Sequence, residues 1–106
     1  MAWIVELAGP ARADIRSVLA GTTREFGTLQ RRRYRGLIDS AVSRLAEGGP
    51  LLPGSQAVSP DHPAQRRIAP PGRASHMFVY RQSAPGRILI LRLLHAGQDT
   101  PRHLPD

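Results

Sequence analysis

Apolar residues recur along the first half of this chain at two different periods. A first strand over residues 3–7 is predicted by a β-rich run whose apolar side chains share one face, Trp3, Val5 and Leu7. Helical spacing then predicts amphipathic helices over 10–26 and 28–47, with Gly27 between them. Because the connecting turn is so short, the two helices should lie antiparallel as a hairpin.

The second half predicts strands. Residues 50–74 carry six prolines and are predicted to be irregular, with one short edge strand over 65–69. Clearer strands are predicted over 76–82 and 87–95, and four consecutive apolar residues in the latter indicate a central strand. The order β-α-α-β-β-β predicts an α+β fold in which a small, mostly antiparallel sheet packs against an N-terminal helical hairpin.

The chain has 106 residues and no cysteine. We expect one domain over residues 1–106 with a core of modest size, because about 100–200 residues is the usual length of one domain. No apolar run approaches the roughly 20 residues that cross a bilayer, and no basic segment precedes a long apolar run at the N-terminus. A cytoplasmic protein without membrane contact is therefore expected, and the lack of cysteine fits a reducing compartment.

All fifteen basic residues are arginines, and the formal net charge is +7. The excess lies in residues 31–35, which carry +4, and in residues 66–106, which carry +5 and include the tail 96–106. Guanidinium groups match phosphates and carboxylates, so the partner is predicted to be nucleic acid or an acidic protein. Biased genome composition is the alternative explanation for a chain without lysine.

The order of elements and the C-terminal residues together resemble a known family. The strand His76–Arg81, the strand Arg87–His95 and the tail that follows resemble the ParE/RelE superfamily of bacterial type II toxins, and the resemblance is closest over residues 76–104. A Leu-His-x-x-x-Asp signature near the end is more typical of ParE, here Leu94, His95 and Asp99.

The resemblance implies a toxin that a cognate antitoxin with an acidic amphipathic segment holds inactive in a hetero-oligomer. ParE-type members inhibit DNA gyrase by binding it, and on that reading no residue is catalytic and no cofactor is needed. RelE-type members are endoribonucleases that cut messenger RNA on the ribosome. A non-toxic, basic nucleic-acid-binding module is a third interpretation, although few aromatic residues are available for base stacking.

Candidate residues follow from these readings. Target contacts on the gyrase reading are predicted at four basic positions, Arg81, Arg87, Arg102 and His103. A ribonuclease would need phosphate-binding arginines and an acid/base group, for which the candidates are Arg66, Arg67, Arg81 and His95. Strand alternation places His76 and Arg81 on opposite faces, and no aromatic residue follows His95, so the gyrase reading is preferred.

Antitoxin contacts are predicted at the edge strand, through Ile68, and at an arginine cluster of the second helix: Arg31, Arg32, Arg33 and Arg35. The alternative interpretation of this cluster is a solvated helix face. Structural roles are predicted for four residues of the last strands and tail, Tyr80, Arg92, His95 and Asp99. His95, Asp99 and His103 have the spacing of metal ligands on a helix, but Pro101 interrupts such a helix, so no metal site is predicted.

Overall fold

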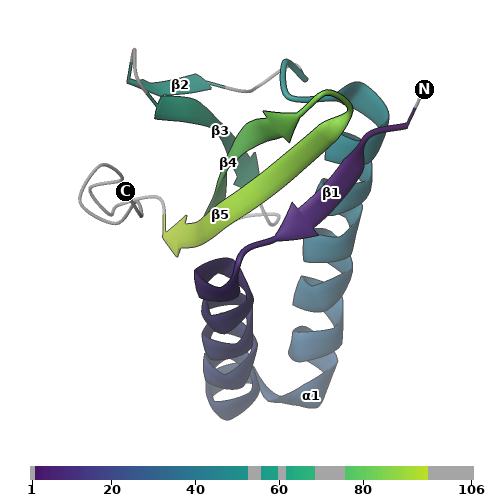
Figure 1. The fold of residues 1–106 in the computed structure, drawn as a ribbon. Helices are drawn as coiled ribbons and strands as arrows, with labels where there is room; N and C mark the ends of the chain where they lie inside the picture. The colour runs from purple at the N-terminus through teal and green to yellow at the C-terminus, as the bar shows by residue number, and fades with distance from the viewer. Residues whose placement is uncertain (1, 53–55, 60–61, 69–75, 96–106) are drawn as a thin grey trace.

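The structure is a computed structural model that describes residues 2–52, 56–59, 62–68 and 76–95. In these residues one sheet has the strand order β1-β5-β4-β3-β2, and a long, bent helix covers one of its faces (Figure 1). The elements are β1 (Ile4–Leu7), α1 (Gly9–Gly48), β2 (Gln56–Ser59), β3 (His62–Ile68), β4 (His76–Ala84) and β5 (Arg87–His95). The α+β fold that the sequence predicts is confirmed.

Strand β5 lies in the interior of the sheet, between β1 and β4. It runs antiparallel to β4 and parallel to β1, whereas β2, β3 and β4 pair antiparallel. An unbroken apolar run suits this position because both faces of an interior strand can be covered. His76 pairs with His95 at one end of the β4–β5 ladder, and Ala84 pairs with Arg87 at the other.

Helix α1 consists of two antiparallel arms, residues 9–26 and 28–48, which Figure 1 shows running away from the sheet and back. Gly27 separates them with φ 87° and ψ 179°, a combination open essentially to glycine alone. Pro10 lies in the first turn, where its missing N–H costs nothing. No helix in the described part of the chain is long and apolar enough to span a membrane.

The main core lies between the two arms of α1 and the sheet. Its buried residues come from both arms and from the helix-facing side of β4 and β5: Ala11, Leu19, Ile38, Ala41, Leu45, Phe78, Tyr80, Ile88, Ile90 and Leu93. Phe26 has the same helical spacing as Leu19, yet its side chain is 66% exposed. The arms extend beyond the sheet, so the periodic pattern continues where no strand of the described residues covers it.

The proline-rich segment holds more regular structure than the sequence predicts. Strand β2 forms within it and pairs with the first part of β3, so the expectation that residues 65–69 form an edge strand is wrong for Gln65, which pairs with Gln56. The prolines at 53 and 60 fall outside β2 and leave a short run free to pair. Strand β3 also begins at His62, earlier than predicted.

Candidate functional site

A groove of about 940 Å³ runs between the two arms of α1, with Leu7 of β1 among its lining residues. Its floor is apolar and includes Ile15, Leu19, Ile38 and Val42. Among the residues that the structure describes, five arginines line it as well, against a single acidic residue, Asp39: Arg12, Arg16, Arg24, Arg31 and Arg35. An apolar floor with basic walls fits an amphipathic helix whose polar edges carry carboxylates.

The groove divides the predicted arginine cluster. Arg31 and Arg35 line it, whereas Arg32 and Arg33 are exposed and do not. Arg35 also lies 3.8 Å from Asp39 in an exposed ion pair one turn along the helix. The sequence analysis missed Arg12, Arg16 and Arg24, although the spacing of Arg12 and Arg16 at i and i+4 places both on one helix face.

A second cluster joins the second arm of α1 to the sheet. The hydroxyl of Tyr34 and Nδ1 of His76 share a hydrogen bond, and the His76 ring meets the His95 ring edge to face with centroids 5.4 Å apart. Burial raises the pKa of Tyr34 to about 12, so the phenol stays protonated. Burial, and then the electrostatic interaction with the neighbouring His95, lower the pKa of His76 below its ordinary value of 6.5.

Acidification is therefore expected to weaken this contact. The unfolded chain protonates His76 near pH 6.5, before the folded protein does, so the stabilising contribution is complete above pH 6.5 and decreases as pH falls toward the lower folded-state pKa. Urea unfolding from about pH 8 to about pH 5 measures the loss.

The matched control for the pH experiment is His76→Asn, which keeps a polar atom near the Tyr34 hydroxyl and does not titrate. The difference in unfolding free energy between wild type and variant should shrink as pH falls below 6.5. A difference that stays constant over this range would contradict the expected role of His76.

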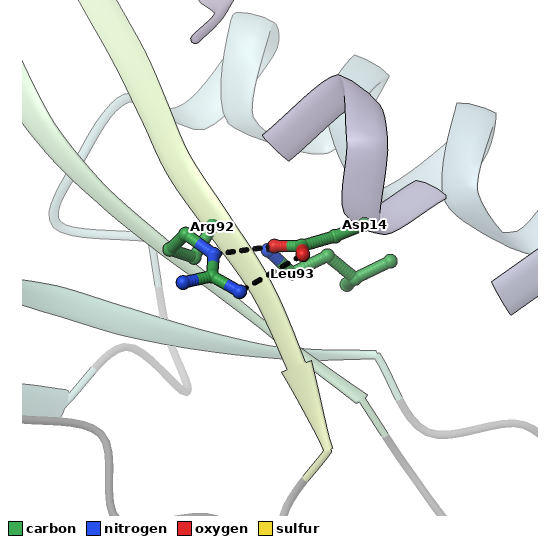
Figure 2. Close-up of polar contacts among 3 residues, drawn as sticks. All are labelled: Asp14, Arg92 and Leu93. Carbon is green, nitrogen blue, oxygen red and sulfur yellow. Dashed lines mark hydrogen bonds and ion pairs between the residues drawn. The ribbon is translucent and has the colours of Figure 1, made fainter. Parts of the chain in front are cut away.

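Asp14 of α1 binds the last part of β5 (Figure 2). Its carboxylate accepts hydrogen bonds from Nε and Nη2 of Arg92 at 2.7 and 2.9 Å, and from the backbone N–H of Leu93 at 3.0 Å. Strand β1 pairs with β5 only as far as Ile90, so this carboxylate satisfies an N–H that lies beyond the β1 ladder. The hydrogen bond to Asp14 raises the pKa of Arg92.

Two of the four predicted target contacts, Arg81 and Arg87, lie apart from the groove. Arg81 is exposed and lines a hollow of about 470 Å³ together with Trp3 and Leu51. Arg87 forms an ion pair with Glu6 at 2.6 Å in which both side chains are about half exposed. Tyr80, next to Arg81 in β4, is fully buried, and its hydroxyl donates to the carbonyl oxygen of Pro50 at 3.0 Å.

The other predicted residues fall on β3 or outside the described residues. Arg66, Arg67 and Ile68 pair through their backbones with Phe78, Met77 and His76 of β4. Three predicted residues of the tail lie outside the described residues, Asp99, Arg102 and His103. Asp14 and Tyr34 are the contacts that sequence reasoning missed, because their partners come from strands far along the chain.

The sequence matches the family described as "ParE toxin of type II toxin-antitoxin system, parDE" over residues 5–100. The chain belongs to the ParE toxin family. It is 32% identical over 102 residues to Toxin ParE of Escherichia coli, a match that covers 94% of this chain and 91% of that protein. The predicted resemblance to the ParE side of the ParE/RelE superfamily is thereby confirmed.

A solved structure has the same fold as this ParE-family toxin. It is a chain of a structure described as "Chromosomal ParDE TA system from P. aeruginosa", with a TM-score of 0.64 and 18% sequence identity. The match covers 89% of this chain and 96% of that chain. Such a likeness places the helical hairpin and sheet in a known architecture.

Proposed function

We propose that this ParE-family toxin arrests growth in the cytoplasm by binding and inhibiting DNA gyrase, and that a cognate antitoxin neutralises it by filling the groove. The observation that carries the proposal is the groove itself, whose apolar floor and five arginines fit a protein segment. Membership of the ParE family supports the choice of gyrase, since inhibition of that enzyme is what the resemblance to ParE-type toxins implies.

The alternative, ribosome-dependent cleavage of messenger RNA, requires arginines and an acid/base group around one phosphate. Arg81 pairs with Leu89, whereas His95 pairs with His76 at the other part of the ladder. Five residues along β4 separate these positions by roughly 16 Å, at about 3.3 Å a residue. This distance separates Arg81 from His95, whereas Arg66 and Arg67 pair with Phe78 and Met77 at the His95 end of the ladder. The groove, and not this distance, therefore favours a function in protein binding, for which no catalytic residue is needed.

The chemistry of the groove defines the antitoxin segment that it would take. An amphipathic helix with apolar anchors at i, i+3 or i+4, and i+7 would cover Ile15, Leu19 and Ile38, while its flanking carboxylates meet the arginines. The backbone of Arg66–Ile68 pairs with β4, and within the described strands no partner lies on its other side. An extended antitoxin segment could add there, next to Ile68.

Two assays test the proposed function together. Induction of the toxin alone should give filamentation and DNA-damage signalling while messenger RNA stays intact, and the purified protein should inhibit gyrase supercoiling until antitoxin is added. Rapid arrest of translation with cut messenger would reject the gyrase function in favour of the ribonuclease. Normal growth with folded toxin present would reject toxicity itself.

The groove arginines should matter more to the antitoxin than their neighbours do. The double variant Arg31→Gln/Arg35→Gln is expected to weaken antitoxin binding by about tenfold or more and to reduce its salt dependence, because both side chains line the groove. Titration calorimetry at two ionic strengths measures both effects.

The adjacent pair provides a control of equal charge. Arg32→Gln/Arg33→Gln removes the same two charges from the same helix, but from positions that do not line the groove. This variant is expected to change antitoxin affinity by less than about threefold, through long-range attraction alone. Equal losses in the two double variants would mean that the groove is not the antitoxin site.

A further inference from the structure

The far end of the helical hairpin exposes two large apolar side chains. Phe26 is 66% exposed and Leu29 is 60% exposed, one on each side of Gly27. All ten residues from 24 to 33 are exposed, because the arms extend away from the sheet (Figure 1). We call Phe26 and Leu29, with the four arginines of residues 24–33, the tip surface: Arg24, Arg31, Arg32 and Arg33.

Neither apolar side chain of the tip surface packs in the core or lines the groove of the described residues. Phe26 and Leu29 do not belong to the core cluster and do not line the groove. A segment confined to the groove would leave both of them in water. Large apolar side chains exposed beside charged residues mark protein interaction sites, and aromatic residues such as Phe are enriched in protein interfaces.

The charge of the tip surface limits what can cover it. Residues 24–33 contain four arginines and one acidic residue, Glu25. None of the four arginines forms an ion pair within the described part of the chain. A second copy of the same surface would meet it with like charge, which disfavours a symmetric dimer. Helices that bind a lipid surface bury a continuous apolar face, and two apolar side chains do not form such a face.

We infer that the tip surface is the contact made with the toxin's target protein, where an acidic surface surrounds an apolar pocket that takes Phe26 and Leu29. This inference rests on the proposed function, since it names the surface by which gyrase is bound. Arg24 and Arg31 belong to both the tip surface and the groove. An antitoxin in the groove therefore engages two charges that the target needs, which gives neutralisation a physical basis.

The test is the double variant Phe26→Ser/Leu29→Ser, compared with wild type and with Gln30→Ala. The substituted side chains are already exposed, so the variant should fold with unchanged thermal stability. We expect gyrase inhibition to require at least about thirtyfold more protein, because two anchors are removed, while antitoxin affinity stays within about twofold. Gln30 is an exposed polar residue of the same stretch, and its variant should inhibit as wild type does.

Four results would overturn the inference. If wild type inhibits gyrase and the double variant does so equally, the proposed function stands and the tip contact fails. If wild type itself leaves gyrase active, the proposed function fails and the tip contact with it. Loss of antitoxin binding in the double variant would assign the tip to the antitoxin. Sedimentation of wild type but not the variant with phosphatidylglycerol vesicles would assign it to lipid.

Discussion

Replacement of Asp14 by alanine is expected to lower the free energy of unfolding by about 2–3 kcal/mol. The side chains of Asp14 and Arg92 are only 17% and 25% exposed, so the change leaves a partly buried guanidinium without the carboxylate that faces it in Figure 2. It also removes the acceptor of the Leu93 N–H. Equilibrium unfolding in urea measures the loss.

Two controls separate burial from charge in this experiment. Asp14→Asn keeps an acceptor for the Leu93 N–H and removes the charge, so it should cost about half as much. Glu6→Ala breaks the ion pair between Glu6 and Arg87, which is about as short as the pair between Asp14 and Arg92. Both of its partners are about half exposed, so the loss in unfolding free energy should stay below about 1 kcal/mol. Equal losses for Asp14→Ala and Glu6→Ala would show that burial does not decide the strength of the Asp14 contact.

Replacement of Gly49 by alanine is expected to cost about 3 kcal/mol, from two sources. Gly49 ends α1 with φ 79° and ψ −176°, a conformation that side chains rarely adopt, while its N–H donates to the carbonyl oxygen of Leu45 at 2.9 Å. An added Cβ would lie 2.7 Å from Nε1 of Trp3, so the indole must also move. Thermal and urea unfolding both report the change.

Gly36 supplies the matched control for Gly49. It lies in the helical second arm of α1, it is exposed, and a Cβ added there would meet nothing within 4 Å. Gly36→Ala should therefore raise the free energy of unfolding by about 0.5–1 kcal/mol through helix propensity. If Gly49→Ala raised the free energy of unfolding as Gly36→Ala does, backbone strain and the Trp3 contact would not explain why position 49 is a glycine.

The sequence predicted the local elements better than the contacts between them. An unbroken apolar run predicted β5 as an interior strand, and Gly27 predicted the break between the helices. Strand β2 was missed because the six prolines of residues 50–74 predicted irregular structure, although Gln56–Ser59 contains none and can pair with β3. Phe26 shares the helical spacing of the buried Leu19, but helical period cannot report where the sheet below a helix stops.

The candidate site was predicted in part for the same reason. Arg31 and Arg35 were identified by their charge, and the structure places both in the groove. Charge alone did not separate them from Arg32 and Arg33, because that distinction depends on where the opposite arm packs. The contact of Tyr34 with His76 joins residues 42 positions apart, and no local pattern encodes it.

By itself the sequence determined the order of elements, the α+β class and the resemblance to ParE toxins, because apolar period and turn residues act over a few neighbouring positions. Only the tertiary structure decided which side chains meet: the groove between the arms, the carboxylate of Asp14 on an N–H 79 positions away, and the exposure of Phe26 and Leu29 at the tip. These features depend on contacts between residues far apart in the sequence and on where the sheet ends, which are properties of the packed molecule.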